Sequence, residues 1–144
     1  MKERICLTSA EFEEWMDDPA VDIEDLRASL RDLARLNRRF GGIADIVRET
    51  DLVIGGSSGS VSVLDVAAGD GYLLRRLKRH LGKRGIRMAG VALDLHPTVV
   101  RLAREACVGS ASIAVERGDA LSLPHAGHSF DVVVSNLSLH HPGP

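Results

Sequence analysis

The sequence contains few of the residues that mark disulfide-stabilised or membrane-spanning proteins. It has two cysteines, Cys6 and Cys107, which are too few and too far apart for a disulfide framework. No apolar run approaches the roughly 18 residues of a membrane span, and the first residues turn acidic too early for a secretory signal. We therefore expect a cytoplasmic protein that does not bind membranes.

Aromatic residues and excess charge are also scarce. Aromatic side chains make up 3% of the sequence, and the formal net charge is -2. Proteins that bind nucleic acid typically offer excess positive charge and aromatic rings for base stacking. The basic run 75–87 is interleaved with leucines that predict the apolar stripe of a helix, so we interpret its charges as the solvent-exposed face of that helix. We expect no nucleic-acid partner.

The 144 residues suffice for one domain with a core of its own. The segment 55–60, GGSSGS, divides them into two parts of different pattern. Residues 1–54 have helical patterns and predict an N-terminal helical cap. Within this cap, Thr8 and Glu11 have the spacing of a capping box for a first helix, which Pro19 ends.

Two further helices are predicted in the cap. Asp22 is a suitable N-cap residue for the second. Its apolar stripe consists of Leu26, Leu30, Leu33, Leu36 and Phe40, and Arg27, Arg31, Arg35 and Arg38 lie off that stripe. Gly41 and Gly42 end this helix. The apolar residues expected in the third helix are Ile43, Ile46, Val47 and Leu52.

Residues 61–144 have strand patterns that alternate with helical patterns. The predicted strands are 61–66, 87–94, 112–115 and 130–135, and the predicted helices are 71–81 and 98–107. Such alternation predicts an α/β fold, here a partial Rossmann-like, doubly wound parallel sheet of about four strands with helices on both faces. Ligands of these sheets bind beyond the carboxyl ends of the strands. The small-residue turn 67–71 lies at such an end.

The turn fits the dinucleotide fingerprint G-x-G-x-x-G poorly. When the fingerprint is aligned on Ala67, Tyr72 occupies the third glycine position, where glycine allows close packing of helix and strand. Asp70 lies where a helix N-terminus would receive pyrophosphate, and its charge would repel that anion. A nucleotide-dependent oxidoreductase is therefore a disfavoured alternative.

The stretch 63–71, VLDVAAGDG, resembles the first motif of class I S-adenosylmethionine-dependent methyltransferases. That motif is a hydrophobic pair, an acid, a hydrophobic residue and G-x-G-x-G. Asp65 occupies the place of the acid, Gly69 and Gly71 match the last two glycines, and Ala67 replaces the first. The resemblance implies that Gly69 and Gly71 let the methionine part of the cofactor lie on the backbone. Asp65 either contacts the cofactor or caps backbone N–H groups near the turn.

Three later stretches resemble the same family in the expected order. GVALDLHP places Asp94 and Leu95 after the second strand, where the family's acid binds both ribose hydroxyls. VERGDALSLP places Asp119 and Ala120 after the third strand, where the family's acid accepts a hydrogen bond from the adenine amino group. FDVVVSNLSLHH places Asn136 at the cofactor end of the fourth strand. For Asp94 and Asp119, the alternative is a plain role as a strand-end or turn carboxylate.

The resemblance covers residues 61–141. It implies the cofactor-binding part of a methyltransferase that uses S-adenosylmethionine and a small-molecule methyl acceptor, and it is closest to the branch that includes quinone-type enzymes. His140 and His141 are poor candidates for catalysis or metal binding, and no metal is expected. The alternative is a non-catalytic S-adenosylmethionine-binding module that needs a partner.

The fourth predicted strand raises a separate question. Family members have further strands beyond it, whereas this sequence ends at SLHHPGP. We expect the chain to be an incomplete methyltransferase fold whose fourth strand, with Val132, Val133 and Val134, presents an unpaired edge. Such an edge promotes self-association.

Overall fold

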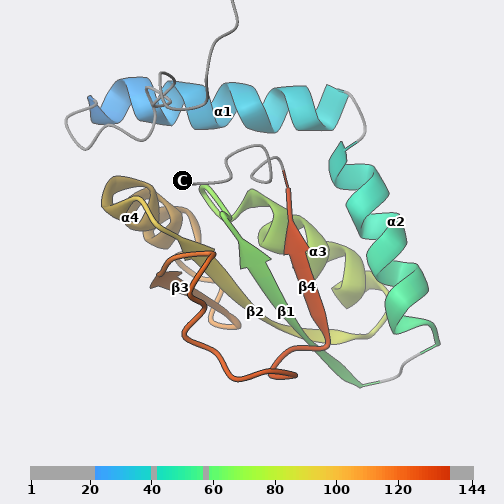
Figure 1. The fold of residues 1–144 in the computed structure, drawn as a ribbon. Helices are drawn as coiled ribbons and strands as arrows, with labels where there is room; N and C mark the ends of the chain where they lie inside the picture. The colour runs from blue at the N-terminus through green and yellow to red at the C-terminus, as the bar shows by residue number, and fades with distance from the viewer. Residues whose placement is uncertain (1–21, 40–41, 57–58, 137–144) are drawn as a thin grey trace, which may run out of the picture.

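The computed structural model describes residues 22–39, 42–56 and 59–136, which form helices and strands around one parallel sheet (Figure 1). Two helices come first, α1 (Ile23–Arg39) and α2 (Gly42–Ile54). The elements that follow are β1 (Ser60–Val66), α3 (Tyr72–Lys83), β2 (Arg87–Asp94), α4 (Pro97–Ala106), β3 (Ile113–Arg117) and β4 (Val132–Ser135). The predicted alternation is confirmed. The helix predicted around Thr8, Glu11 and Pro19 lies outside the described residues.

The four strands are parallel and have the order β3-β2-β1-β4. β1 lies between β2 and β4, so the strand order reverses at β1. At its carboxyl end, Val66 lies opposite Leu93 of β2 and Ser135 of β4. Because ligands of open α/β sheets bind where the strand order reverses, the turn after β1 occupies the expected position for a ligand site.

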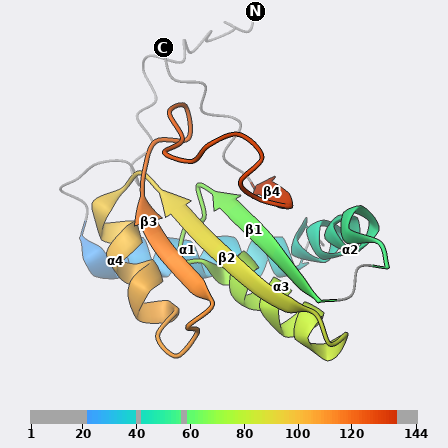
Figure 2. The same cartoon turned by 90° about the horizontal axis from the view of Figure 1, so that it is seen from below.

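Among the described elements, α3 and α4 cover the same face of the sheet. Figures 1 and 2 show both helices on that face and the segment between β3 and β4 on the opposite one. The connections β1-α3-β2 and β2-α4-β3 advance in the same direction across the sheet, and a right-handed crossover then places both helices on one face. The return from β3 to β4 contains no described helix. Helices therefore cover one face in this part of the chain, where the sequence predicted both.

The core lies on both faces of β1. Val61 and Val63 belong to the same cluster as Leu74 and Leu77 of α3, and both leucines are fully buried. On the opposite face, Leu64, Val66 and Leu93 form a smaller cluster. Burial on both faces is typical of a central parallel strand. Each fully buried leucine contributes roughly 1.5–3 kcal/mol to stability.

Asp22 caps helix α1 as predicted, because its Oδ1 accepts a hydrogen bond from Glu24 N at 2.8 Å. Leu26 is fully buried and packs with Val99 and Leu102 of α4. Leu36 is 49% exposed, because these α4 side chains pack against the first half of the stripe. Phe40 lies outside the described residues.

Helix α2 begins at Gly42, so the glycine pair separates two helices as predicted. Three residues of this helix are buried, namely Ile43, Thr50 and Ile54, and Ile46 and Val47 are half-buried between them. Together they recur about once per helical turn. Leu52 lies in this helix as predicted and is 69% exposed, because a helix of 3.6 residues per turn carries this position away from the buried face.

Candidate functional site

The turns that follow β1, β2 and β3 are joined by backbone hydrogen bonds. Ala68 N donates to Leu93 O at 3.0 Å, and Gly118 N donates to Asp94 O at 3.0 Å. These two bonds connect the three carboxyl ends into one surface. In Figure 1, α1 crosses above the carboxyl end of β1. The predicted site residues from all three strands therefore lie together at the carboxyl-terminal end of the sheet.

The turn 67–71 uses the left-handed backbone region three times. The φ angles are 55° at Ala67, 55° at Gly69 and 71° at Gly71. Glycine adopts this region without a steric penalty, whereas alanine pays roughly 1–2 kcal/mol. Ala67 therefore keeps the conformation that a glycine would favour at the first position of the motif. Because the residues with these positive φ angles lie so close together in the sequence, the backbone turns tightly at the end of β1.

Asp94 connects the end of β2 to this turn. Its Oδ2 accepts a hydrogen bond from Gly69 N at 3.0 Å, and its Oδ1 accepts one from His96 N at 3.0 Å. The N-cap of α4 is His96, whose Nδ1 accepts from Thr98 N at 3.2 Å. Asp94 is half-buried, and an ionised carboxylate offers about four acceptor positions. It holds the turn in place.

Asp65 is the most deeply buried carboxyl group of the site. Its exposed fraction is 1%, and its Oδ2 has no hydrogen-bond partner among residues 22–39, 42–56 and 59–136. Burial, with the neighbouring charges of Asp94 and Asp70 as further causes, raises the pKa of Asp65 to about 7. A buried carboxyl with an unsatisfied oxygen is costly. Such groups concentrate at functional sites.

Asp70 connects the turn to helix α3, which follows it. Its Oδ2 forms an ion pair with Arg75 Nη2 of α3 at 2.9 Å, and its Oδ1 accepts from Tyr72 N at 3.0 Å. Arg75 also donates to the backbone oxygen of Asp70 and lies 3.8 Å from the Sγ of the buried Cys107. Sequence reasoning did not identify this role of Asp70 and Arg75. The signal was an acid just before a helix and an arginine in its first turn.

The remaining predicted residues lie around the same edge. Asp119 is exposed, and its Oδ1 accepts from Leu121 N at 2.8 Å, which is the turn role considered as the alternative. Leu95 and Ala120 are exposed. Asn136 is half-buried and directly follows β4, where Ser135 pairs with Val66. His140 and His141 lie outside the described residues.

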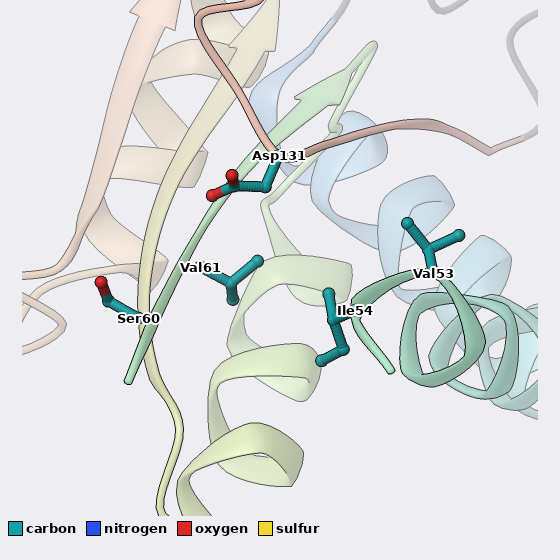
Figure 3. Close-up of a pocket in the computed structure, with 5 residues that line it drawn as sticks. All are labelled: Val53, Ile54, Ser60, Val61 and Asp131. Atoms are coloured by element: carbon teal, nitrogen blue, oxygen red, sulfur yellow. The ribbon is translucent and has the colours of Figure 1, made fainter. Parts of the chain in front are cut away.

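Two pockets of similar volume lie at opposite ends of β1. One, of about 240 Å³, is lined by residues of α1 and of the turn, namely Arg31, Ala34, Arg35, Asp70 and Tyr72. The other, of about 250 Å³, is lined by Val53, Ile54, Ser60, Val61 and Asp131 and is shown in Figure 3. Because the second lies at the amino end of β1, it is separate from the candidate site.

Neither a membrane helix nor a metal cluster is found in the part of the chain that the structure describes. No helix there is long and apolar enough to cross a bilayer. No group of three or more His, Cys, Asp or Glu side chains within the same residues could hold a metal ion.

The family model of the methyltransferase domain matches residues 63–144, which is more than half of the chain. The chain therefore belongs to this methyltransferase domain family. Family membership implies S-adenosylmethionine as the cofactor. No curated protein matches the sequence.

Solved structures of methyltransferases share the fold. A SAM-dependent methyltransferase from Aquifex aeolicus has a TM-score of 0.59 and 21% identity over 80% of this chain and 56% of its own. A protein from Methanococcus maripaludis, described as an S-adenosyl-L-methionine-dependent methyltransferase, has a TM-score of 0.63 and 18% identity over 83% of this chain and 52% of its own. These likenesses show a class I, Rossmann-like methyltransferase fold. The chain spans about half the length of these proteins.

A third similar structure contains a partner protein. It is a Haloferax volcanii complex between the Trm112 methyltransferase activator and a methyltransferase. The matching chain has a TM-score of 0.55 and 27% identity, over 79% of this chain and 46% of its own.

Proposed function

We propose that this chain binds S-adenosylmethionine along the carboxyl ends of β1, β2 and β3 and forms the cofactor-binding part of an enzyme that methylates a small molecule. The observation that carries the proposal is the hydrogen bond from Gly69 N to Asp94 Oδ2, at 3.0 Å. It joins two predicted cofactor-binding residues that are 25 positions apart in the sequence.

The residues at this edge fit the cofactor in charge and in shape. Asp94 and Asp119 are carboxylates that would accept hydrogen bonds from the ribose hydroxyls and the adenine amino group. Gly69 carries no side chain at the turn, against which the methionine part would lie, with Ala67 at the start of that turn. Gly71 adopts the left-handed backbone of the turn, and a Cβ there would meet Cys107 Sγ at 3.2 Å.

Leu95, Ala120 and Asn136 complete the proposed cofactor surface. Leu95 is 60% exposed beside Asp94, and Ala120 is exposed beside Asp119. Both side chains would offer apolar contact to the nucleoside. Asn136 follows β4 and would offer an amide to the reacting end of the cofactor.

When bound, S-adenosylmethionine supplies an electrophilic methyl group on a sulfonium centre. The residues of the chain would then align the reactants and exclude water, which is sufficient for methyl transfer without a catalytic triad. Helix α1 contributes to this exclusion, because Leu30 Cδ2 lies 3.4 Å from the position that a Cβ of Gly69 would occupy.

The second candidate function is a non-catalytic or partner-dependent module. The open side of β4, the outermost strand of the sheet, favours it. β4 pairs only with β1 among the described strands, and Val133 on it is 58% exposed. An open parallel edge with an exposed valine can pair with another chain. The occupant would be a second copy of this chain or a protein partner. The similar Haloferax volcanii methyltransferase was solved in complex with an activator protein. We propose a cytoplasmic location for either form.

The test is a pair of calorimetric titrations of the 144-residue chain, one with S-adenosylhomocysteine and one with NAD. Binding of S-adenosylhomocysteine alone supports the proposal, and binding of NAD alone contradicts it. Release of S-adenosylhomocysteine from S-adenosylmethionine in the presence of small-molecule acceptors then separates an enzyme from a binding module. The same assay with an added partner protein separates a partner-dependent enzyme from an independent one.

A further inference from the structure

Two glycines flank Asp70 in the turn after β1. Gly69 and Gly71 have φ angles of 55° and 71°, and glycine has more backbone freedom than any other residue. Asp70 therefore lies at the point of the turn where the backbone itself provides the least restraint. An ordered turn at this point needs contacts from side chains outside it.

Arg75 of α3 makes two such contacts with Asp70. Its Nη1 donates to the backbone oxygen of Asp70, and its Nη2 pairs with Asp70 Oδ2 at 2.9 Å. A guanidinium group presents its donors in a rigid, planar fork, so it holds the backbone and the side chain of Asp70 in a fixed relation. The other oxygen of the same carboxylate, Oδ1, accepts from Tyr72 N at 3.0 Å.

The guanidinium group also contacts the end of helix α4. Arg75 Nη1 lies 3.8 Å from the Sγ of Cys107, which is the buried C-cap residue of α4. Cys107 adjoins the turn as well, since a Cβ on Gly71 would lie 3.2 Å from its Sγ. The side chain of Arg75 is only 23% exposed. Arg75 therefore joins the turn to α3 and to the end of α4.

We propose that Arg75 is a positioning residue that holds the turn 67–71 in the shape that receives S-adenosylmethionine. The inference rests on the cofactor site proposed above, and Arg75 acts through Asp70 rather than by touching the cofactor. Without this anchor the turn would lose conformational entropy when the cofactor binds, which lowers affinity. With the anchor, that entropy is lost during folding instead.

The experiment compares the affinity of four chains for S-adenosylhomocysteine by calorimetry. They are the wild type, Arg75→Met, which keeps the apolar stem, Arg75→Lys, which keeps the charge but lacks the fork, and Arg76→Met. Arg76→Met is the matched control, because Arg76 is the next residue of α3 and is exposed. Arg75→Lys decides the question if Arg75→Met does not fold.

Amide hydrogen exchange, measured by NMR without ligand, reports the order of the turn directly. Gly71 N donates to Ala68 O, and Tyr72 N donates to Asp70 Oδ1, both at 3.0 Å, so both amides depend on the shape of the turn. The reference amide is that of Asp131, which donates to β1 at its amino end.

We expect Arg75→Met to bind S-adenosylhomocysteine about five- to thirtyfold more weakly than the wild type, which corresponds to ordering one residue on binding. Arg75→Lys should show a smaller loss. In both variants the amides of Gly71 and Tyr72 should exchange faster, and that of Asp131 should be unchanged. Arg76→Met should match the wild type in both measurements.

Wild-type affinity in both Arg75 variants overturns the proposal. So does wild-type exchange at Gly71 and Tyr72 in a variant that has lost affinity, because the loss then has a cause other than the order of the turn. An equal loss of affinity in Arg76→Met also overturns it. If the wild type does not bind S-adenosylhomocysteine, the proposed function is refuted and this inference fails with it. Equally tight binding by the wild type and the Arg75 variants refutes this inference alone.

Discussion

Replacing Asp65 by asparagine should change how the stability of the fold depends on pH. The carboxyl group is 1% exposed, and burial, with Asp94 and Asp70 as further causes, raises its pKa from an ordinary value of 3.8 to about 7. Asp70 is itself paired with Arg75, which weakens its share of this effect. Asp65→Asn keeps the shape of the side chain and removes its ionisation.

The sign and size follow from the two pKa values. Between pH 3.8 and about 7 the unfolded chain has released this proton while the folded protein still holds it. The free energy of unfolding therefore falls as the pH rises through this window. A difference of about 3 pKa units, at 1.36 kcal/mol each, corresponds to about 4 kcal/mol. Above pH 7 the wild type bears the full penalty, which Asp65→Asn does not.

Urea unfolding of both proteins from pH 4 to pH 8.5 measures this difference. We expect nearly equal stability at pH 4 and an advantage for Asp65→Asn that grows to about 4 kcal/mol at pH 8. Asp131→Asn is a control, because hydrogen bonds from Ser62 lower the pKa of Asp131. Its titration therefore lies below the measured range, and the difference in stability between Asp131→Asn and the wild type should stay nearly constant from pH 4 to pH 8.5. A gap between wild type and Asp65→Asn that stays constant with pH would refute the reasoning.

The turn and the sheet edge give further expectations. Ala67→Gly should stabilise the fold by roughly 1 kcal/mol by relieving the left-handed strain at Ala67, whereas Ala68→Gly, where φ is not positive, should destabilise it in the same thermal melts. Gly69→Val should abolish S-adenosylhomocysteine binding in calorimetry with the α/β circular dichroism spectrum retained, and Gly85→Val, also at positive φ but in open space, should bind normally. Val133→Lys should shift sedimentation toward the monomer if β4 mediates self-association, and an unchanged distribution would count against that edge.

Much of the fold follows from local patterns. β2 has the bounds Arg87–Asp94 that its composition predicts, and α3 differs from prediction by one residue at its start and two at its end. These elements have strong periodicity and clear glycine boundaries, which act over a few residues. The face of the sheet that each helix covers was less predictable, because it depends on the order of the strands and the hand of each crossover.

The site was predictable in position and less so in detail. The motif placed Asp65, Asp94 and the turn near the carboxyl-terminal end of the sheet, and the structure confirms these positions. The hydrogen bond from Gly69 N to Asp94 and the approach of Arg31 to the turn join residues far apart in sequence. Such contacts depend on tertiary packing, about which local patterns are silent. The unsatisfied oxygen of Asp65 also emerges only when every neighbouring donor is placed.

The most direct test of the proposed cofactor site is the affinity for S-adenosylhomocysteine of the wild type, Asp94→Ala and Asp131→Ala. Asp131 is a matched control, because its carboxylate also accepts two hydrogen bonds, from Ser62 N and Oγ at 2.7 Å each, but at the amino end of β1. Loss of a charged hydrogen bond of about 1.5–3 kcal/mol should weaken binding roughly ten- to a hundredfold in Asp94→Ala. We predict that Asp131→Ala binds like the wild type. Equal affinity in all three proteins, or an equal loss in both variants, would contradict the site.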